Sequence, residues 1–170
     1  MPIPIYNIKN LHFSRGSHQL HIKHFDIHRG ACYVFEGRMG SGKTTLLEIL
    51  YLRRYFGKGE IQFEQKAIQS YSNKDYQNQI AVVPQNIFSP WGTVDNYMKK
   101  TIKKYSHIKN IDKNLNAMVS KMNISSLLHR KMKSLSPGEL RWITLATQIA
   151  ADAKVLFIDG YELYLTKEEI

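Results

Sequence analysis

The 170 residues suffice for one domain with a substantial core, and 43% hydrophobic with 22% charged residues is a globular composition, which excludes a disordered chain. No apolar run approaches the length of a membrane span, and the N-terminus lacks the basic-then-apolar design of a signal peptide. A single cysteine excludes an internal disulfide framework. We therefore expect a cytoplasmic protein.

The net charge of +10 predicts a basic surface. Such a surface can meet nucleic acid, anionic lipid or an acidic protein, or can simply be a solvated helix face. Aromatic residues do not interleave with the lysines as a base-stacking platform requires, which argues against nucleic acid. The charges gather in two groups: Lys99, Lys100, Lys103, Lys104, Lys109 and Lys113, and then Arg130, Lys131 and Lys133.

The first third of the chain is predicted to be β-structure. Residues 3–8 and 20–27 are β-prone and are separated by the turn-prone residues 14–17, so we expect an antiparallel pair. A short apolar run at 32–35 predicts a further strand, and the apolar periodicity of 44–52 predicts a partly buried helix.

The residues between this strand and helix fit the phosphate-binding pattern G-x-x-x-x-G-K-[ST], the P-loop. Glycine lets backbone N–H groups approach phosphate oxygens closely. The lysine ammonium would contact the outer phosphates, the threonine hydroxyl would bind Mg²⁺, and the helix would direct its positive dipole end at the anion. The pattern consists of Gly37, Arg38, Met39, Gly40, Ser41, Gly42, Lys43 and Thr44.

The remainder of the chain alternates strands with helices. We expect strands at 60–63 and 80–83, the second ending at Pro84, and a last buried strand at 155–158 that ends at Asp159.

Two helices are predicted between these strands. Thr93 is a suitable N-cap for a helix over 94–105, and apolar residues spaced three and four apart predict a second helix over 111–122.

The segment Leu135-Ser136-Pro137-Gly138-Glu139 has two interpretations. Locally it is a helix start, with Ser136 as N-cap, Pro137 in the first turn and Glu139 closing a capping box. Functionally, a helix N-terminus with a serine hydroxyl is also an anion site. Taken alone, the segment leaves both interpretations open.

The order of these motifs resembles the ATP-binding-cassette (ABC) ATPase domain. Residues 135–139 resemble its signature, Gln85 and its flanks resemble its Q-loop, and 155–159 resemble its Walker B strand. The resemblance runs from about Ile3 to Asp159 and implies an α/β fold. It further implies a P-loop NTPase core with a mostly parallel sheet, an N-terminal antiparallel β subdomain and an inserted helical subdomain. These would form one domain over residues 1–170. Its parts are the β subdomain and P-loop core at 1–92, the helical subdomain at 93–134, and the signature helix and Walker B strand at 135–170.

The resemblance also implies a site for ATP and Mg²⁺. In the family, two domains pair head to tail, and each nucleotide lies between one P-loop and the partner's signature. By this analogy the P-loop residues and Thr45 bind phosphates, and Ser136 and Gly138 close on the partner's nucleotide. The family's base-stacking aromatic falls near Phe13 or Arg15. The implied metal ligands are Thr44, Gln85 and Asp159, and the implied catalytic residues are Asp159, Gln85 and Glu162.

Several positions depart from the family pattern. Gly160 replaces the glutamate that polarises the attacking water, and Glu162 is a candidate replacement. Losing a general base costs roughly 10²–10⁴ in rate. The family's dimer-contact aspartate falls at about Thr166, which instead begins a capping-box pattern. No histidine follows Asp159, so the family's switch histidine has no counterpart in these residues.

We therefore expect an ATP-binding subunit that couples ATP binding to a membrane transporter or membrane-associated partner, with hydrolysis left open by the glycine at position 160. Its expected partners are a second ABC-type domain, identical or different, and an integral membrane subunit, with a place at the cytoplasmic face of the membrane. Three alternatives remain at this point: a nucleotide-gated regulatory switch, a P-loop small-molecule kinase, and an ABC ATPase that acts on nucleic acid.

Overall fold

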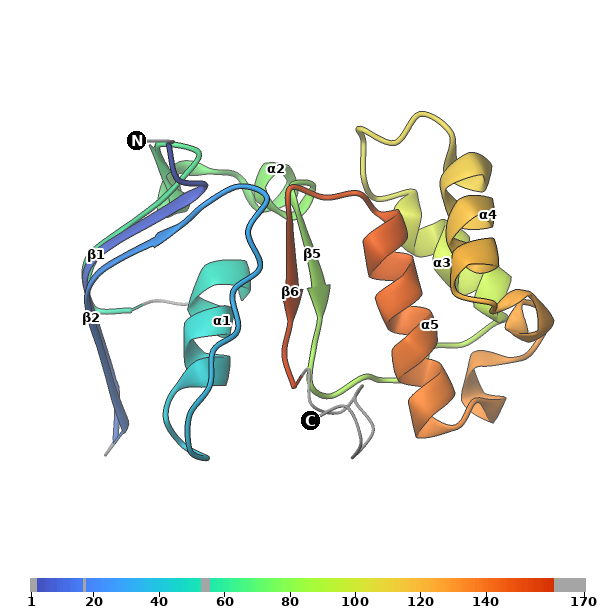
Figure 1. Ribbon diagram of the computed structural model, residues 1–170, viewed down its shortest axis with the longest axis horizontal. Coiled ribbons are helices and arrows are strands. Elements are labelled where there is room, and N and C mark those ends of the chain that lie inside the picture. The colour runs from blue at the N-terminus through green and yellow to red at the C-terminus, as the bar shows by residue number, and fades with distance from the viewer. Residues whose placement is uncertain (1–2, 17, 53–55, 161–170) are drawn as a thin grey trace. The chain divides into compact units, whose positions relative to one another are not determined.

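The computed structural model describes residues 3–16, 18–52 and 56–160 (Figure 1). Its contacts divide the chain into two compact units, Met1–Asn73 and Lys74–Ile170. Among the described residues, no helix is long and apolar enough to cross a bilayer.

The first unit is built on an antiparallel sheet. Its strands are β1 (Tyr6–Arg15), β2 (His18–Ile27), β3 (Lys58–Phe63) and β4 (Lys66–Ala67), in the spatial order β2-β1-β3-β4. The long β1–β2 hairpin confirms the predicted antiparallel pair, although β1 begins at Tyr6 rather than Ile3.

Helix α1 (Lys43–Leu52) adds a second set of buried apolar residues to those of the sheet. It confirms the predicted helix within one residue. The chain then passes through a short 3-10 turn at Ile68–Ser70 to α2 (Asn73–Gln77) at the boundary between the units. The buried apolar residues of α1 and the sheet include Leu46, Leu47, Ile49, Leu50, Tyr6, Ile8, Leu11, Ile61 and Phe63.

The strand predicted at residues 32–35 is wrong, because residues 31–38 form neither helix nor strand. The rings of Tyr33 and Phe35 instead pack against Phe25 of β2, each with its centroid 5.7 Å from that of Phe25. Val34 is 57% exposed. A strand needs a neighbouring backbone to form its ladder, and among the described residues none pairs with this segment.

The second unit contains a parallel pair of strands, β5 (Ile80–Val83) and β6 (Val155–Ile158). They pair in register from Ile80↔Val155 to Val83↔Ile158. Both strands have the predicted bounds. Because the pair is parallel and in register, the residues that follow the two strands emerge at the same edge.

Three helices enclose the main core of this unit: α3 (Val94–Ile102), α4 (Ile111–Lys121) and α5 (Pro137–Ala150). Figure 1 shows α5 alongside α3 and α4. Short 3-10 turns at Ser125–Leu127 and Met132–Ser134 connect α4 to α5. The buried residues that form this core include Val94, Met98, Ile102, Leu115, Val119, Ile143 and Ala146.

Helix α3 starts as predicted and ends early. The Thr93 side chain accepts a hydrogen bond from the Asn96 N–H, which confirms the predicted cap. The helix ends at Ile102 rather than at Tyr105. The Tyr105 hydroxyl lies 3.2 Å from Ile80 O and 3.1 Å from Gln148 Oε1, so Tyr105 links this end of the segment to β5 and α5.

Candidate nucleotide-binding site

The P-loop joins the aromatic segment 31–38 to the N-terminus of α1. Its central glycines have φ angles of +81° at Gly40 and +94° at Gly42, in a region that residues with a Cβ rarely adopt. The Leu46 N–H donates to Gly42 O at 2.8 Å, so the loop continues directly into the first helical turn. The backbone at Gly40 and Gly42 therefore has the conformation for which the P-loop pattern requires glycine.

Lys43 folds back over the loop that precedes it. Its Nζ donates to Gly37 O at 2.6 Å and lies 3.3 Å from Arg38 O. Helix α1 has no acidic residue in its first turn. The ammonium group and the positive end of the helix dipole therefore meet at one place, with no carboxylate in the first helical turn, which suits an anion.

His18 at the start of β2 also contacts this loop. Its Nε2 lies 3.4 Å from Thr45 Oγ1, and it would lie 3.3 Å from a Cβ added at Gly42. His18 was not among the residues predicted from the sequence. No local pattern marks it, because the contact depends on how the hairpin meets α1, 27 residues later in the chain.

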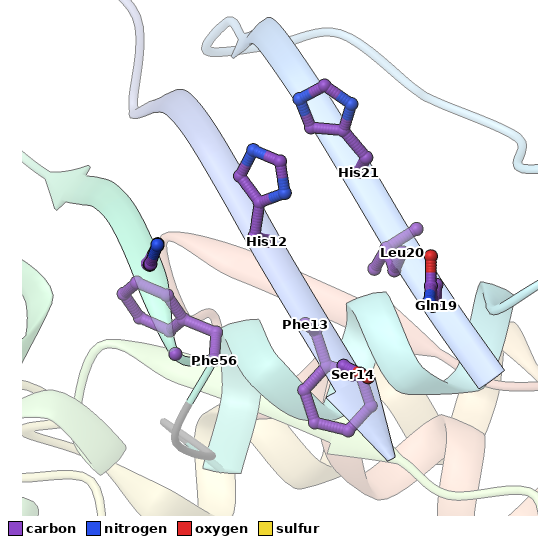
Figure 2. A pocket seen from close by; sticks show the side chains of 9 residues that line it. His12, Phe13, Ser14, Gln19, Leu20, His21 and Phe56 are labelled. Carbon is purple, nitrogen blue, oxygen red and sulfur yellow. The ribbon is translucent and has the colours of Figure 1, made fainter. Parts of the chain in front are cut away.

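Phe13, one of the two candidates for stacking on the base, lines an open pocket of about 540 Å³ beside the hairpin (Figure 2). Its ring lies edge-on to that of His18, with centroids 6.3 Å apart. The other candidate, Arg15, ends β1 and is exposed, and it does not line the pocket. His18 therefore contacts both Phe13, which lines the pocket, and the end of the P-loop at Gly42 and Thr45.

In the second unit, the structure brings Gln85 and Asp159 to the same edge of the parallel pair. Gln85 lies two residues beyond β5, and Asp159 follows β6 directly. The Asp159 N–H donates to Val83 O at 2.9 Å, and the residue is only 7% exposed. Gln85 is exposed. The two predicted metal ligands thus share one edge, as residues after adjacent parallel strands must.

Gly160 has a φ angle of +74°, so its backbone is left-handed. A glutamate here would adopt this conformation only at a cost of roughly 1–2 kcal/mol. The observed backbone therefore disfavours a glutamate at this position. Glu162 and Thr166, also singled out from the sequence, lie outside the described residues.

The predicted signature segment begins α5 as a complete capping box. The Glu139 N–H donates to Ser136 Oγ at 3.2 Å, and the Ser136 N–H donates to Glu139 Oε2 at 2.7 Å. Ser136 and Gly138 are exposed. The local interpretation of the segment is thus confirmed, and both residues remain accessible to a ligand.

Arg130 completes this arrangement and was interpreted from the sequence only as part of a basic surface. Its guanidinium lies 2.5 Å from Glu139 Oε1 and also donates to Ser134 O at 2.7 Å. The hydrogen bond from the Ser136 N–H, followed by that from Arg130, lowers the pKa of Glu139 below its ordinary value.

The chemistry of the predicted donor atoms fits Mg²⁺. Hydroxyl, amide and carboxylate oxygens are the ligands this hard cation prefers, and Thr44, Gln85 and Asp159 supply one of each. Within the described ranges, no three His, Cys, Asp or Glu side chains form a metal cluster. A magnesium ion bound largely by phosphate and water needs no such cluster.

Comparison with known proteins identifies the family. A family model described as ABC transporter matches residues 20–161. The ATP-dependent lipid A-core flippase of Vibrio vulnificus (strain CMCP6) is 32% identical over 168 residues, which cover 90% of this chain and 28% of the flippase. A putative ABC transporter ATP-binding protein of Clostridium tetani (strain Massachusetts / E88) is 29% identical over 154 residues, which cover 88% of this chain and 34% of that protein.

A solved structure of the ATP binding subunit of an ABC transporter has the same fold. It matches with a TM-score of 0.84 at 16% identity, over 96% of this chain and 69% of that one. This likeness confirms the predicted α/β P-loop fold. The chain spans 28% and 34% of the length of the two curated relatives. With most of its length matched by the family model, the chain belongs to the ABC transporter family and is an ATP-binding domain of that family.

Proposed function

We propose that this domain binds Mg-ATP at the P-loop and couples the nucleotide to a membrane transporter. The observation that carries the proposal is the position of Lys43 and the glycine loop at the open N-terminus of α1. Lys43 and the loop N–H groups, together with Gly37, Arg38, Met39, Ser41 and Thr45, would hold the phosphates. Phe13 is the favoured contact for the base, because it lines a pocket next to His18.

Thr44, Gln85 and Asp159 would hold Mg²⁺. The ion would neutralise part of the phosphate charge when bound. Asp159 is held in place by its backbone hydrogen bond to Val83, whereas the exposed Gln85 is the more adaptable of the two residues at that edge.

A second copy, or a related ABC domain, would complete the site. Ser136 and Gly138 at the N-terminus of α5 would contact the nucleotide held by the partner's P-loop. Such head-to-tail contacts close on themselves when a two-fold axis repeats them. Both residues are exposed, as this role requires.

The helical subdomain, residues 93–134 in the proposed division, would contact the membrane-spanning partner. Phe88 and Trp91, just before it, are 88% and 85% exposed, and aromatic side chains of this kind are typical of interfaces. Its exposed lysines would favour a position near anionic headgroups at the cytoplasmic face. The name of the Vibrio relative, an ATP-dependent flippase, supports a transport role.

Hydrolysis by this domain would be slow, because Gly160 supplies no carboxylate to polarise the attacking water. A nucleotide-gated switch is therefore the second candidate function, and the left-handed backbone at Gly160 favours it. Membership in the ABC transporter family argues against the alternative of a small-molecule kinase.

Phosphate release at saturating Mg-ATP by wild type, Gly160→Glu and Gly160→Ala tests the catalytic part of this proposal. We expect Gly160→Glu to accelerate release by about 10²-fold, in the range attributed to a general base. Gly160→Ala carries the same backbone cost without a carboxylate and should stay at the wild-type rate. Fast release by wild type would contradict the proposal, and Glu162→Gln would then locate the group that replaces the glutamate.

A further inference from the structure

Two histidines face each other on the β1–β2 hairpin. His12 and His21 are directly paired in the antiparallel register, and both are exposed. Their rings are stacked, with centroids 3.9 Å apart and an interplanar angle of 23°. Figure 2 shows the two rings side by side above their strands. Among the described residues, neither ring has a hydrogen-bond partner.

The backbone holds this pair at a fixed spacing. His12 lies on a central strand, paired with His21 of β2 on one side and with Lys58 of β3 on the other. The backbones of β1 and β3 are in close contact, since a Cβ at Gly59 would lie 2.4 Å from Asn10 O. Binding of one ligand by both imidazoles would therefore cost the protein little additional backbone entropy.

Two imidazoles at this spacing suit a transition-metal ion. Directly opposed residues of an antiparallel pair have Cβ atoms about 4.5–5.5 Å apart, and imidazole nitrogens bind such ions at about 2.0–2.1 Å. Rotation of the exposed rings about their side-chain bonds can point one nitrogen of each at a shared ion. We propose that His12 and His21 form a two-point chelate for a divalent transition-metal ion.

The donor set determines which ions are accepted. Imidazole suits Cu²⁺, Ni²⁺ and Zn²⁺, whereas Mg²⁺ prefers oxygen ligands. The described residues offer no third His, Cys, Asp or Glu ligand, so water would fill the remaining positions. Lys58 lies opposite His12 in the ladder with β3, and it is exposed, so its ammonium can extend into solvent.

The site uses none of the proposed phosphate-binding residues, but His12 and His21 line the same pocket as Phe13, the proposed contact for the base. His12 directly precedes Phe13, so a bound ion would fix the hairpin at the point where it borders the pocket. The site thus gives this domain a ligand of a different chemical class from ATP.

Calorimetric titration with Ni²⁺, without nucleotide, tests the proposal. All proteins should carry Cys32→Ser, because the exposed Cys32 thiol would compete for the metal. We expect one Ni²⁺ site whose affinity falls about tenfold or more in His12→Gln and in His21→Gln, since the second imidazole binds intramolecularly. His24→Gln is the matched control: His24 lies on the same strand but beside Asp26, and its loss should leave the affinity unchanged.

Thermal unfolding gives a second measurement. Ni²⁺ should raise the midpoint of the parent protein and of His24→Gln but not of the two pair variants, and Mg²⁺ should raise none of them. If His12→Gln folds poorly on its central strand, His21→Gln decides. Lys43→Ala should bind Ni²⁺ like the parent, so failure of the ATP proposal would not be confused with failure of this one. Equal Ni²⁺ affinity in all variants, or equal loss in His24→Gln, would overturn the proposal.

Discussion

Two helix N-termini of this domain are predicted to meet phosphate, and they are built in opposite ways. Helix α1 follows a glycine loop, has no acid in its first turn and presents Lys43 to an anion. Helix α5 is capped by its own Ser136 and Glu139, and Arg130 binds the capping carboxylate.

This contrast indicates different tasks for the two ends. At α1, the backbone N–H groups and the Lys43 ammonium are available to a nucleotide that this same chain binds. At α5, two backbone N–H groups are already satisfied and a carboxylate lies beside them, so a phosphate gains less there. We therefore expect α1 to determine the affinity for ATP, while α5 contributes only when a partner's nucleotide approaches Ser136 and Gly138.

Of the glycine, cap and carboxylate substitutions that separate the two helix ends, Gly42→Ala has the largest expected effect. Alanine would be strained at a φ angle of +94°, so the free loop would relax and ATP would have to restore the strained form. A strain of about 1.4 kcal/mol corresponds to a tenfold loss of affinity for Mg-ATP, measured by calorimetry. Gly30→Ala, at φ +69° in a turn outside the loop, is the control and should lose stability without losing affinity. Equal Mg-ATP affinities of the Gly42→Ala and Gly30→Ala proteins would contradict the role assigned to the P-loop at α1.

Ser136→Ala should have a moderate effect, and on stability rather than on nucleotide binding. Removing the N-cap should lower the free energy of unfolding in urea by about 1 kcal/mol. Ser120→Ala, on the exposed face of α4, should change it by no more than about 0.5 kcal/mol. ATP binding by the single chain should be unaffected. A Ser136→Ala protein with unchanged stability but weakened ATP binding would show that α5 is an open anion site like α1.

The smallest expected effect is the pH dependence contributed by Glu139. Because its pKa is lowered in the folded protein, its stabilisation is complete above the ordinary value of 4.5 and is lost as the pH falls through the lowered folded value. Urea unfolding from pH 6 downward should therefore show a steeper loss of stability in wild type than in Glu139→Gln. Arg130→Gln should lie between them, because the Ser136 N–H remains the larger cause. Parallel pH curves for all three proteins would contradict this assignment.

The sequence predicted the elements whose signal is complete within a short stretch. Ile80–Val83 and Val155–Ile158 are continuous apolar runs ended by Pro84 and Asp159, and both strands have the predicted bounds. The run at 32–35 has a similar composition, but a strand also requires a partner, and its aromatic residues pack on Phe25 instead. Composition alone does not reveal the presence of a neighbouring strand.

The same limit applies to the candidate site. The P-loop and the capping box are local patterns, so their glycines, Lys43 and Ser136 could be identified from spacing. His18 and Arg130 could not, because each acts through a contact between segments: the hairpin with α1, and the turn before α5 with its first helical turn. Gly160 was noticed as a missing carboxylate, whereas its left-handed backbone became visible only in the structure.

Calorimetric binding of Mg-ATP to wild type, Lys43→Ala and Lys23→Ala tests the central claim most directly. Lys23 is an exposed lysine of β2 outside the P-loop, so it controls for the loss of one positive charge. We predict that wild type binds one Mg-ATP, that Lys43→Ala binds it about 10- to 100-fold more weakly, as expected for a lost hydrogen bond to a charged group, and that Lys23→Ala binds like wild type. Absence of binding in wild type, or equal binding in all three proteins, would contradict the claim that the open N-terminus of α1 holds the nucleotide.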